Sequence, residues 1–207
     1  MNRLLTIVLT AIAGFVLVAC GSSASPSGSQ SASAPASQAA SQAAQPSAGG
    51  NGPSFTEGAV ANLEALIPST VAGVTLTKAS MQGSAYLLSA NGDPTTVKFL
   101  QDLGVSPSAV SMAYGIGFST DASTSIVMFV FRAAGADSNR LLAAFKTAND
   151  ANGSSPLQWA KSTLGGKQVE SAVNSGQTSY LYVKGDTLFF ISASTQAIAE
   201  PILRGLP

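Results

Sequence analysis

The residues that most often carry enzyme chemistry are scarce in this chain of 207 residues, which has no histidine and one cysteine, Cys20. Without histidine, the commonest general base and metal ligand are missing, together with any histidine-based triad. No lysine has a serine three positions before it, and no Gly-x-Ser-x-Gly motif occurs. We therefore expect a protein that is not an enzyme and that needs no metal and no cofactor.

Carboxylates are the remaining candidates for catalysis. A glycosidase-like pair of carboxylates could form through folding, so a cell-surface hydrolase of this kind is the alternative hypothesis. Asp93, Asp137 and Asp186 have local roles as helix caps or in a turn. No closely spaced acidic loop of the calcium-binding type is present. The acidic residues are Glu57, Glu64, Asp93, Asp102, Asp121, Asp137, Asp150, Glu170, Asp186 and Glu200.

Two glycine-containing segments depart from nucleotide-binding loops. Residues 165–167 end like a phosphate loop, but Lys161 stands where the first glycine belongs and Gln168 replaces the final Ser or Thr. Residues 115–117 lack the third glycine of a dinucleotide fingerprint and lie within an expected strand. Turns and close packing explain both segments better than nucleotide binding does.

Two side-chain patterns could support ligand binding. Ala113, Gly115 and Gly117 form a small-residue strand face that allows close approach to the backbone. A helix is the ordinary occupant of such a face, and a ligand is the rarer one. Tyr180 and Tyr182 share one face of a later strand and could form an aromatic platform, although a half-exposed cross-strand pair is the usual meaning.

The N-terminal segment has the features of an export signal. Arg3 supplies one positive charge, and residues 4–18 form an uncharged, mostly apolar run. This run is short for a permanent span, which needs about 20 residues. A positive start, a short apolar core and small residues at its end are typical of a cleavable signal. Leu17-Val18-Ala19-Cys20, followed by Gly21-Ser22-Ser23, resembles the lipobox of bacterial lipoproteins.

This resemblance implies that residues 1–19 are removed and that the Cys20 thiol carries a diacylglycerol. Two acyl chains suffice for stable anchoring, since each buried CH₂ contributes about 0.8 kcal/mol. Acylation also removes a lone thiol that oxidation would threaten. We therefore expect a lipid anchor on the extracytoplasmic face of the cell membrane, or on the outer membrane where the organism has one. The alternative is an ordinary signal peptide or anchor helix with an incidental cysteine.

Behind the cysteine, the composition divides the mature chain into a tether and one domain. Residues 21–53 contain only Ser, Ala, Gln, Pro and Gly apart from Asn51, so we expect a disordered tether within the segment 20–53. Its typical reach is roughly 30 Å. Residues 54–207 have the length of a single globular domain.

The charge balance argues against nucleic-acid binding. Lys plus Arg and Asp plus Glu number ten each, so nothing builds the basic field that such binding requires. The absence of a second cysteine excludes an internal disulfide, so packing alone must hold the domain.

Hydrophobic periodicity predicts a mixed domain. Helices are expected at residues 56–67, 93–103, 139–148 and 195–204, and strands at 73–80, 110–119, 125–132, 168–173, 179–184 and 187–193. Alternation is clearest in 110–119, whereas 125–132 is apolar on both faces, as in a central strand covered above and below. We expect an α+β fold in which about four helices pack on a predominantly antiparallel sheet.

A faint internal similarity accompanies this pattern. Residues 69–73 (STVAG) resemble residues 162–166 (STLGG). This similarity suggests a duplicated ββα-type unit, and chance among small residues is the other explanation.

The anchor, the tether and the missing catalytic groups favour a noncatalytic extracytoplasmic lipoprotein that binds a ligand, a cell-envelope component or a protein. A large apolar pocket would indicate a lipid-type carrier, whereas a flat sheet face would indicate a protein partner.

Overall fold

The computed structural model describes residues 55–83, 85, 94–152, 156–174 and 177–207. Residues 1–54, which include the signal segment, Cys20 and the tether, lie outside this range, as does Asp93. The predictions made for them are therefore not tested by the structure.

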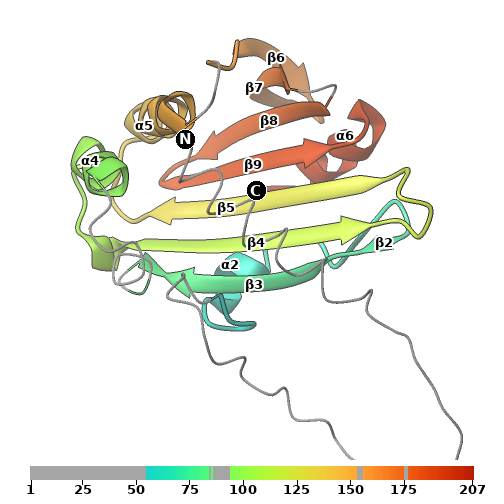
Figure 1. Cartoon of the computed structure of the whole chain (residues 1–207), viewed down its shortest axis with the longest axis horizontal. Helices are drawn as coiled ribbons and strands as arrows, with labels where there is room; N and C mark the ends of the chain where they lie inside the picture. Colours follow the sequence, from blue (N-terminus) through green and yellow to red (C-terminus); the bar gives the residue numbers. More distant parts are fainter. Residues whose placement is uncertain (1–54, 84, 86–93, 153–155, 175–176) are drawn as a thin grey trace, which may run out of the picture.

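The described strands form one large antiparallel sheet and one small hairpin (Figure 1). The strand order in the large sheet is β3-β4-β5-β9-β8-β7-β6, and every neighbouring pair is antiparallel. The strands are β3 (Thr77–Gln82), β4 (Val110–Phe118), β5 (Ser125–Ala133), β6 (Ala160–Leu164), β7 (Lys167–Asn174), β8 (Gln177–Lys184) and β9 (Thr187–Ala193). The hairpin joins β1 (Thr70–Val71) and β2 (Val74–Thr75).

Helices pack on this sheet, so the expected α+β fold is confirmed. The described helices are α2 (Ala61–Glu64), α4 (Pro94–Leu103), α5 (Ser138–Asn152), α6 (Gln196–Gly205) and the 3-10 turn η1 (Pro107–Ala109). The predicted cap of α5 is confirmed, because Asp137 Oδ1 accepts hydrogen bonds from the backbone N–H groups of Asn139 and Arg140 at 3.0 and 3.1 Å.

Two sequence predictions need correction. The helix expected at 56–67 is reduced to the single turn α2, because Thr56 pairs with Ser80 as an isolated bridge and Gly58 adopts a φ of +77°. The edge strand β6 was not expected, because its sequence, AKSTL, lacks a clear alternation of apolar and polar residues.

The two similar segments of the sequence form similar hairpins. Ala72 and Gly73 connect β1 to β2 with φ of 49° and 79°, and Gly165 and Gly166 connect β6 to β7 with φ of 61° and 78°. Positive φ at both turn residues is typical of a type I′ turn. The helices α5 and α6 that follow each half pack on opposite faces of the sheet, so the structure supports the similarity for the hairpins alone.

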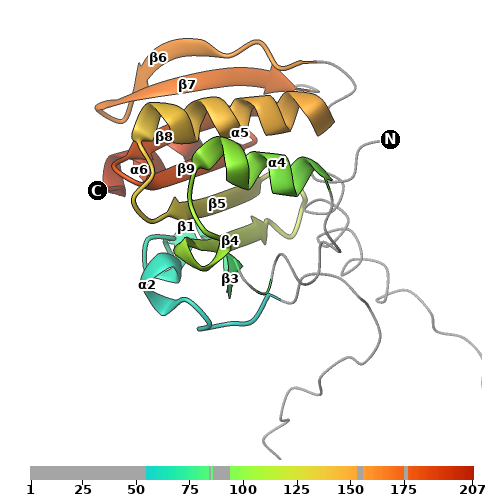
Figure 2. The same cartoon turned by 90° about the vertical axis from the view of Figure 1, so that its left-hand side faces the viewer.

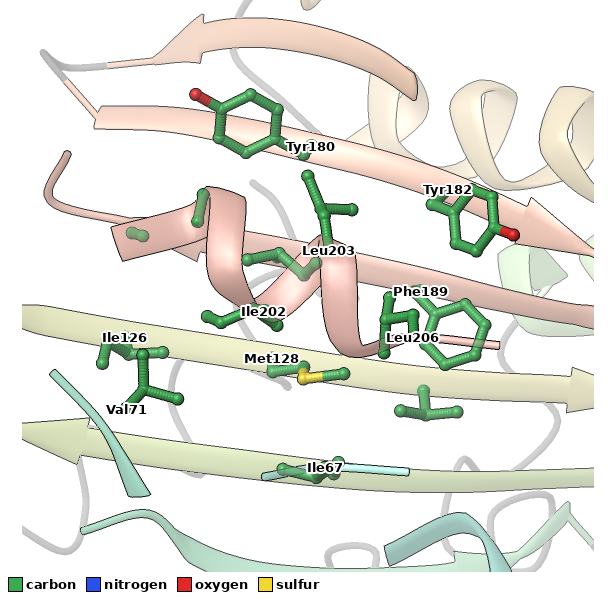
Figure 3. Close-up of a cluster of buried hydrophobic side chains, with 14 of the residues drawn as sticks. Ile67, Val71, Ile126, Met128, Tyr180, Tyr182, Phe189, Ile202, Leu203 and Leu206 are labelled. Atoms are coloured by element: carbon green, nitrogen blue, oxygen red, sulfur yellow. The ribbon is translucent and has the colours of Figure 1, made fainter. Parts of the chain in front are cut away.

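The rear face of the sheet carries the larger core. Helices α2 and α6 lie behind the strands in Figure 1, and Figure 3 shows Ile202, Leu203 and Leu206 of α6 packed over this face. Met128 on β5 and Ile191 on β9 point to the rear and are fully buried. Burial of this kind stabilises the fold by about 25 cal/mol per Å² of apolar surface removed from water.

Helices α4 and α5 lie side by side across one end of the sheet (Figure 2). Leu103 and Leu141 from these helices share a second core with Phe131 and Leu188 on the front face. This packing covers the front face only where β5 ends and β9 begins.

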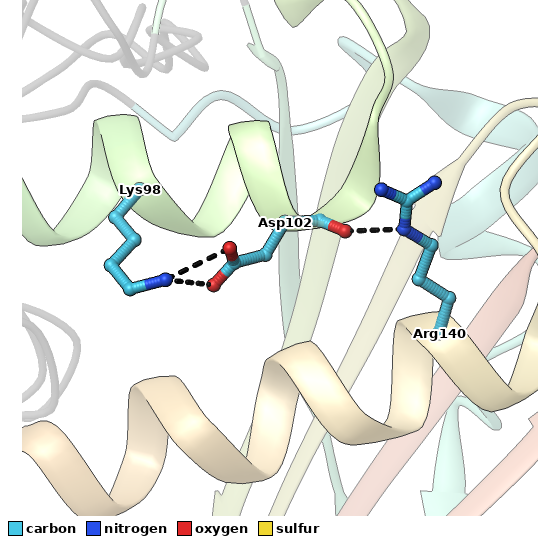
Figure 4. Close-up of polar contacts among 3 residues, drawn as sticks. All are labelled: Lys98, Asp102 and Arg140. Carbon is cyan, nitrogen blue, oxygen red and sulfur yellow. Dashed lines mark hydrogen bonds and ion pairs between the residues drawn. The ribbon is translucent and has the colours of Figure 1, made fainter.

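The two helices are joined by a polar contact (Figure 4). Arg140 Nε donates a hydrogen bond of 2.6 Å to the backbone carbonyl of Asp102, close to the end of α4. Lys98 forms an ion pair of 2.8 Å with the Asp102 carboxylate one helical turn away. Gly104 ends α4 with a φ of +68°, which is typical of a glycine helix cap.

Candidate functional site

The front face of the sheet is less completely buried than the rear face. On β5, Ile126, Met128 and Val130 point to the rear with 0% exposure, whereas Val127 and Phe129 point to the front and are only half-buried. The prediction that this strand is covered above and below is thus confirmed for the rear, whereas the front is well covered only beside α4 and α5.

Apolar side chains continue across three neighbouring strands of this face. Their register pairs place them together, and no described helix covers them. Phe118 is 54% exposed, and the other members are half-buried. We call this group the open front face, and it consists of Tyr114, Ile116, Phe118, Val127, Phe129 and Phe190.

Aromatic rings form a continuous row across this face. Phe55 contacts Tyr114 edge-on with ring centroids 4.9 Å apart. Tyr114 and Phe129 are 6.3 Å apart, Phe129 and Phe190 are 6.2 Å apart, and Phe145 of α5 ends the row 6.1 Å from Phe190. Such spacings are those of interacting aromatic pairs. Burial in this row raises the pKa of the Tyr114 hydroxyl above its ordinary value.

The border of the open front face toward β8 is polar and uncharged. Gln177 Nε2 donates a hydrogen bond of 2.7 Å to Ser125 Oγ, and Ser192 Oγ donates one of 3.4 Å to Gln177 Oε1. An apolar centre with a hydrogen-bonding, uncharged border can hold a partner without ion pairs.

A second candidate site is an open depression of about 420 Å³ between α2 and β3. Both acidic side chains of this region, Glu57 and Glu64, line it, together with Lys78 and Ser69. It is therefore the place among the described residues where the hypothesis of a carboxylate hydrolase can be examined.

The polar groups of this depression are largely engaged with the protein. Glu64 Oε1 accepts hydrogen bonds from the Gly58 backbone N–H at 2.8 Å and from Ser80 Oγ at 2.5 Å. Lys78 Nζ donates to the carbonyl of Ile67 at 2.5 Å and to Ser69 Oγ at 3.2 Å. These contacts hold both ends of α2, so the geometry indicates a structural role for Glu64 and Lys78.

The two binding features expected from the sequence are resolved by packing. Tyr180 and Tyr182 are buried beneath α6 at 4% and 9% exposure, so the aromatic-platform interpretation is wrong. Tyr182 Oη instead donates a hydrogen bond of 2.8 Å to the Pro207 carbonyl. The small-residue face is occupied by protein, since a Cβ on Gly115 would lie 2.5 Å from Ile67 Cγ2.

The remaining tests concern metal ions, membrane spans and related proteins. Among the described residues, no group of three or more Cys, Asp or Glu side chains could hold a metal ion. None of the described helices has the length and apolar character needed to span a membrane. Comparisons with protein-family models, curated proteins and solved structures find no match. The sequence signal for the open front face is the strand 125–132, whose apolar residues occupy both faces.

Proposed function

We propose that this protein is an extracytoplasmic lipoprotein, anchored through Cys20, whose domain binds a partner without catalysing a reaction. The lipobox-like sequence and the uncharged segment 21–53 support the anchor and the tether. The anchor holds the domain near the membrane, and the tether gives it a reach of roughly 30 Å.

The open front face is the observation that supports binding. A sheet face must normally be buried against another layer, and its exposed apolar patches mark interaction sites more often than chance. Phe118 is 54% exposed at the end of this face, beside the half-buried Ile116 and Val127. A partner seated here would bury these three side chains.

The anchor is tested by replacing the cysteine. The wild-type protein should enter the detergent phase in a partition experiment, and Cys20→Ser should leave the protein unlipidated, without a lipid mass on its N-terminal peptide. Ser22→Ala is the matched control and should behave as wild type. A Cys20→Ser protein with the same acyl mass and the same partition would contradict the lipid anchor.

Partner binding is tested by crosslinking in cells. A photo-reactive phenylalanine analogue at position 118 should give a discrete adduct, whereas the analogue at Lys184 should not. Lys184 is an exposed control at the opposite end of the strands. Equal labelling at both positions, or none at 118, would contradict a binding role for this face.

A carboxylate hydrolase is the second hypothesis, favoured by one observation: Glu57 and Glu64 line the same depression. It predicts turnover of aryl glycosides that falls at least about a hundredfold in Glu57→Gln and not in the control Glu200→Gln. Equal background turnover in the wild type and both variants would reject it.

A further inference from the structure

We propose that the partner of the open front face is an amphipathic α-helix of another protein, which completes the missing helical layer of the sheet. This inference rests on the proposed binding function and adds the class of partner.

The layers of the fold support a helix as the occupant. The rear face is packed by α2 and α6, and one end of the front face is packed by α4 and α5 (Figures 1 and 2). Beyond those helices, the described residues leave Val127 and Phe129 half-buried and Phe118 exposed. Helices commonly cover a sheet in α+β domains, and a helix with one apolar stripe supplies the same cover from outside.

The size of the patch favours a helix over a second copy of the chain. The apolar patch spans three strands and runs from Tyr114 to Phe118, which gives about 14 Å in each direction and roughly 200 Å². A stable protein dimer buries about 800 Å² on each partner, so this patch alone is too small for self-association. A helix about 10 Å wide matches the patch with two to three turns.

The charge of the patch specifies which surface of the helix would dock. All six residues of the open front face are uncharged, and so are the neighbouring Ser125, Gln177 and Ser192. The docked stripe of the partner should therefore be apolar, with its charged residues turned to solvent. Without ion pairs across the interface, its affinity should depend little on salt.

The probe is a fluorescent Leu/Lys/Glu peptide of roughly 14 residues, with leucines at i, i+3, i+4 and i+7 spacing and no net charge. Its control is a peptide of the same composition in which that spacing is scrambled. The receptor is the mature chain with Cys20→Ser, exported with an ordinary cleavable signal, so the measurement does not depend on the lipid. Fluorescence anisotropy should report binding of the amphipathic peptide and not of the scrambled one.

Variants locate the interaction. Phe118→Ser should weaken binding by about tenfold, because exposed aromatic anchors carry much of the energy of small interfaces. Val127→Thr is a second, nearly isosteric variant and should weaken binding in the same direction. Val173→Ser is the matched control: its side chain is 68% exposed on β7, away from the open front face, and the affinity should not change.

Three outcomes would overturn the inference. The first is no binding of the amphipathic peptide, or equal binding of the scrambled peptide. The second is an affinity unchanged by both Phe118→Ser and Val127→Thr. The third is a wild-type dimer in sedimentation that Phe118→Ser dissociates, which would assign the face to a second copy. If the in-cell crosslink at position 118 forms while the peptide fails, the binding function stands and only the helix class is wrong.

Discussion

Alanine substitutions in the glycine-bearing face of β4 test whether this face is a packing surface. Gly117 lies beneath the β1–β2 hairpin, and Gly115 lies beneath the segment that follows α2. A Cβ at Gly117 would stand 2.6 Å from Leu76 Cδ2 and 2.8 Å from the carbonyl oxygen of Thr75. A Cβ at Gly115 would stand 2.5 Å from Ile67 Cγ2. Carbon atoms in good contact are about 3.5–4.0 Å apart, so both sites would be overpacked.

The size of the effect follows from what must move. Overpacking a core costs about 1–3 kcal/mol, and the gain from replacing glycine in a strand returns about 0.5–1 kcal/mol. Gly117→Ala should lie at the upper end, with a net loss of about 2 kcal/mol, because a backbone carbonyl cannot rotate away as a side chain can. In a domain of this size that loss corresponds to a fall in melting temperature of about 4–8 °C.

The assay is thermal unfolding followed by circular dichroism, with Gly205→Ala as the control. A Cβ at Gly205 would have no atom within 4 Å, so this variant should melt at the wild-type temperature or slightly higher. For Gly115→Ala, the partner change Ile67→Leu removes the Cγ2 branch that would clash. The double variant should therefore recover about 1 kcal/mol relative to the sum of the singles. Unchanged melting of Gly117→Ala, together with no coupling between positions 115 and 67, would refute this packing.

Two further predictions concern polar groups. Ser80→Ala should destabilise the domain by about 2–3 kcal/mol, because it leaves the buried N–H of Val60 without its 2.6 Å acceptor and Glu64 without a donor; a denaturant midpoint equal to wild type would contradict this role. Hydrogen bonds from Ser119 and Ser123 lower the pKa of Asp121 from 3.8 to about 2, so its stabilising contribution is present above about pH 4 and lost as the pH falls through 2. Melting curves of wild type and Asp121→Asn should differ at pH 5 and converge near pH 2, and a constant difference would reject the assignment.

Local signals in the sequence predicted much of the fold. Period-two alternation located β4, proline at the first helical position and Gly104 bounded α4, and Asp137 capped α5. Each signal depends on neighbours within a few residues, so no tertiary contact is needed to interpret it. The edge strand β6 escaped prediction because its pairing with β7, and not its own pattern, makes it a strand.

The candidate site was less accessible to sequence reasoning. Tyr180 and Tyr182 alternate as exposed residues often do, yet α6 folds back over them. Phe118 and Val127, in contrast, read as ordinary strand residues, and their exposure depends on where α4 and α5 end on the sheet. Burial of a given strand face is decided by segments far away in the chain, which periodicity cannot identify.

The sequence by itself determined the properties that depend on composition and local pattern. These are the lipobox-like site at Cys20, the uncharged segment behind it, the absence of histidine chemistry and the α+β class. Only the tertiary structure decided that the glycine face of β4 is filled by protein, that Glu64 is engaged by Gly58 and Ser80, and that one sheet face stays partly open. The physical reason is that a strand presents apolar residues to both faces with equal ease, whereas the number and direction of the helices determine which of those faces is covered.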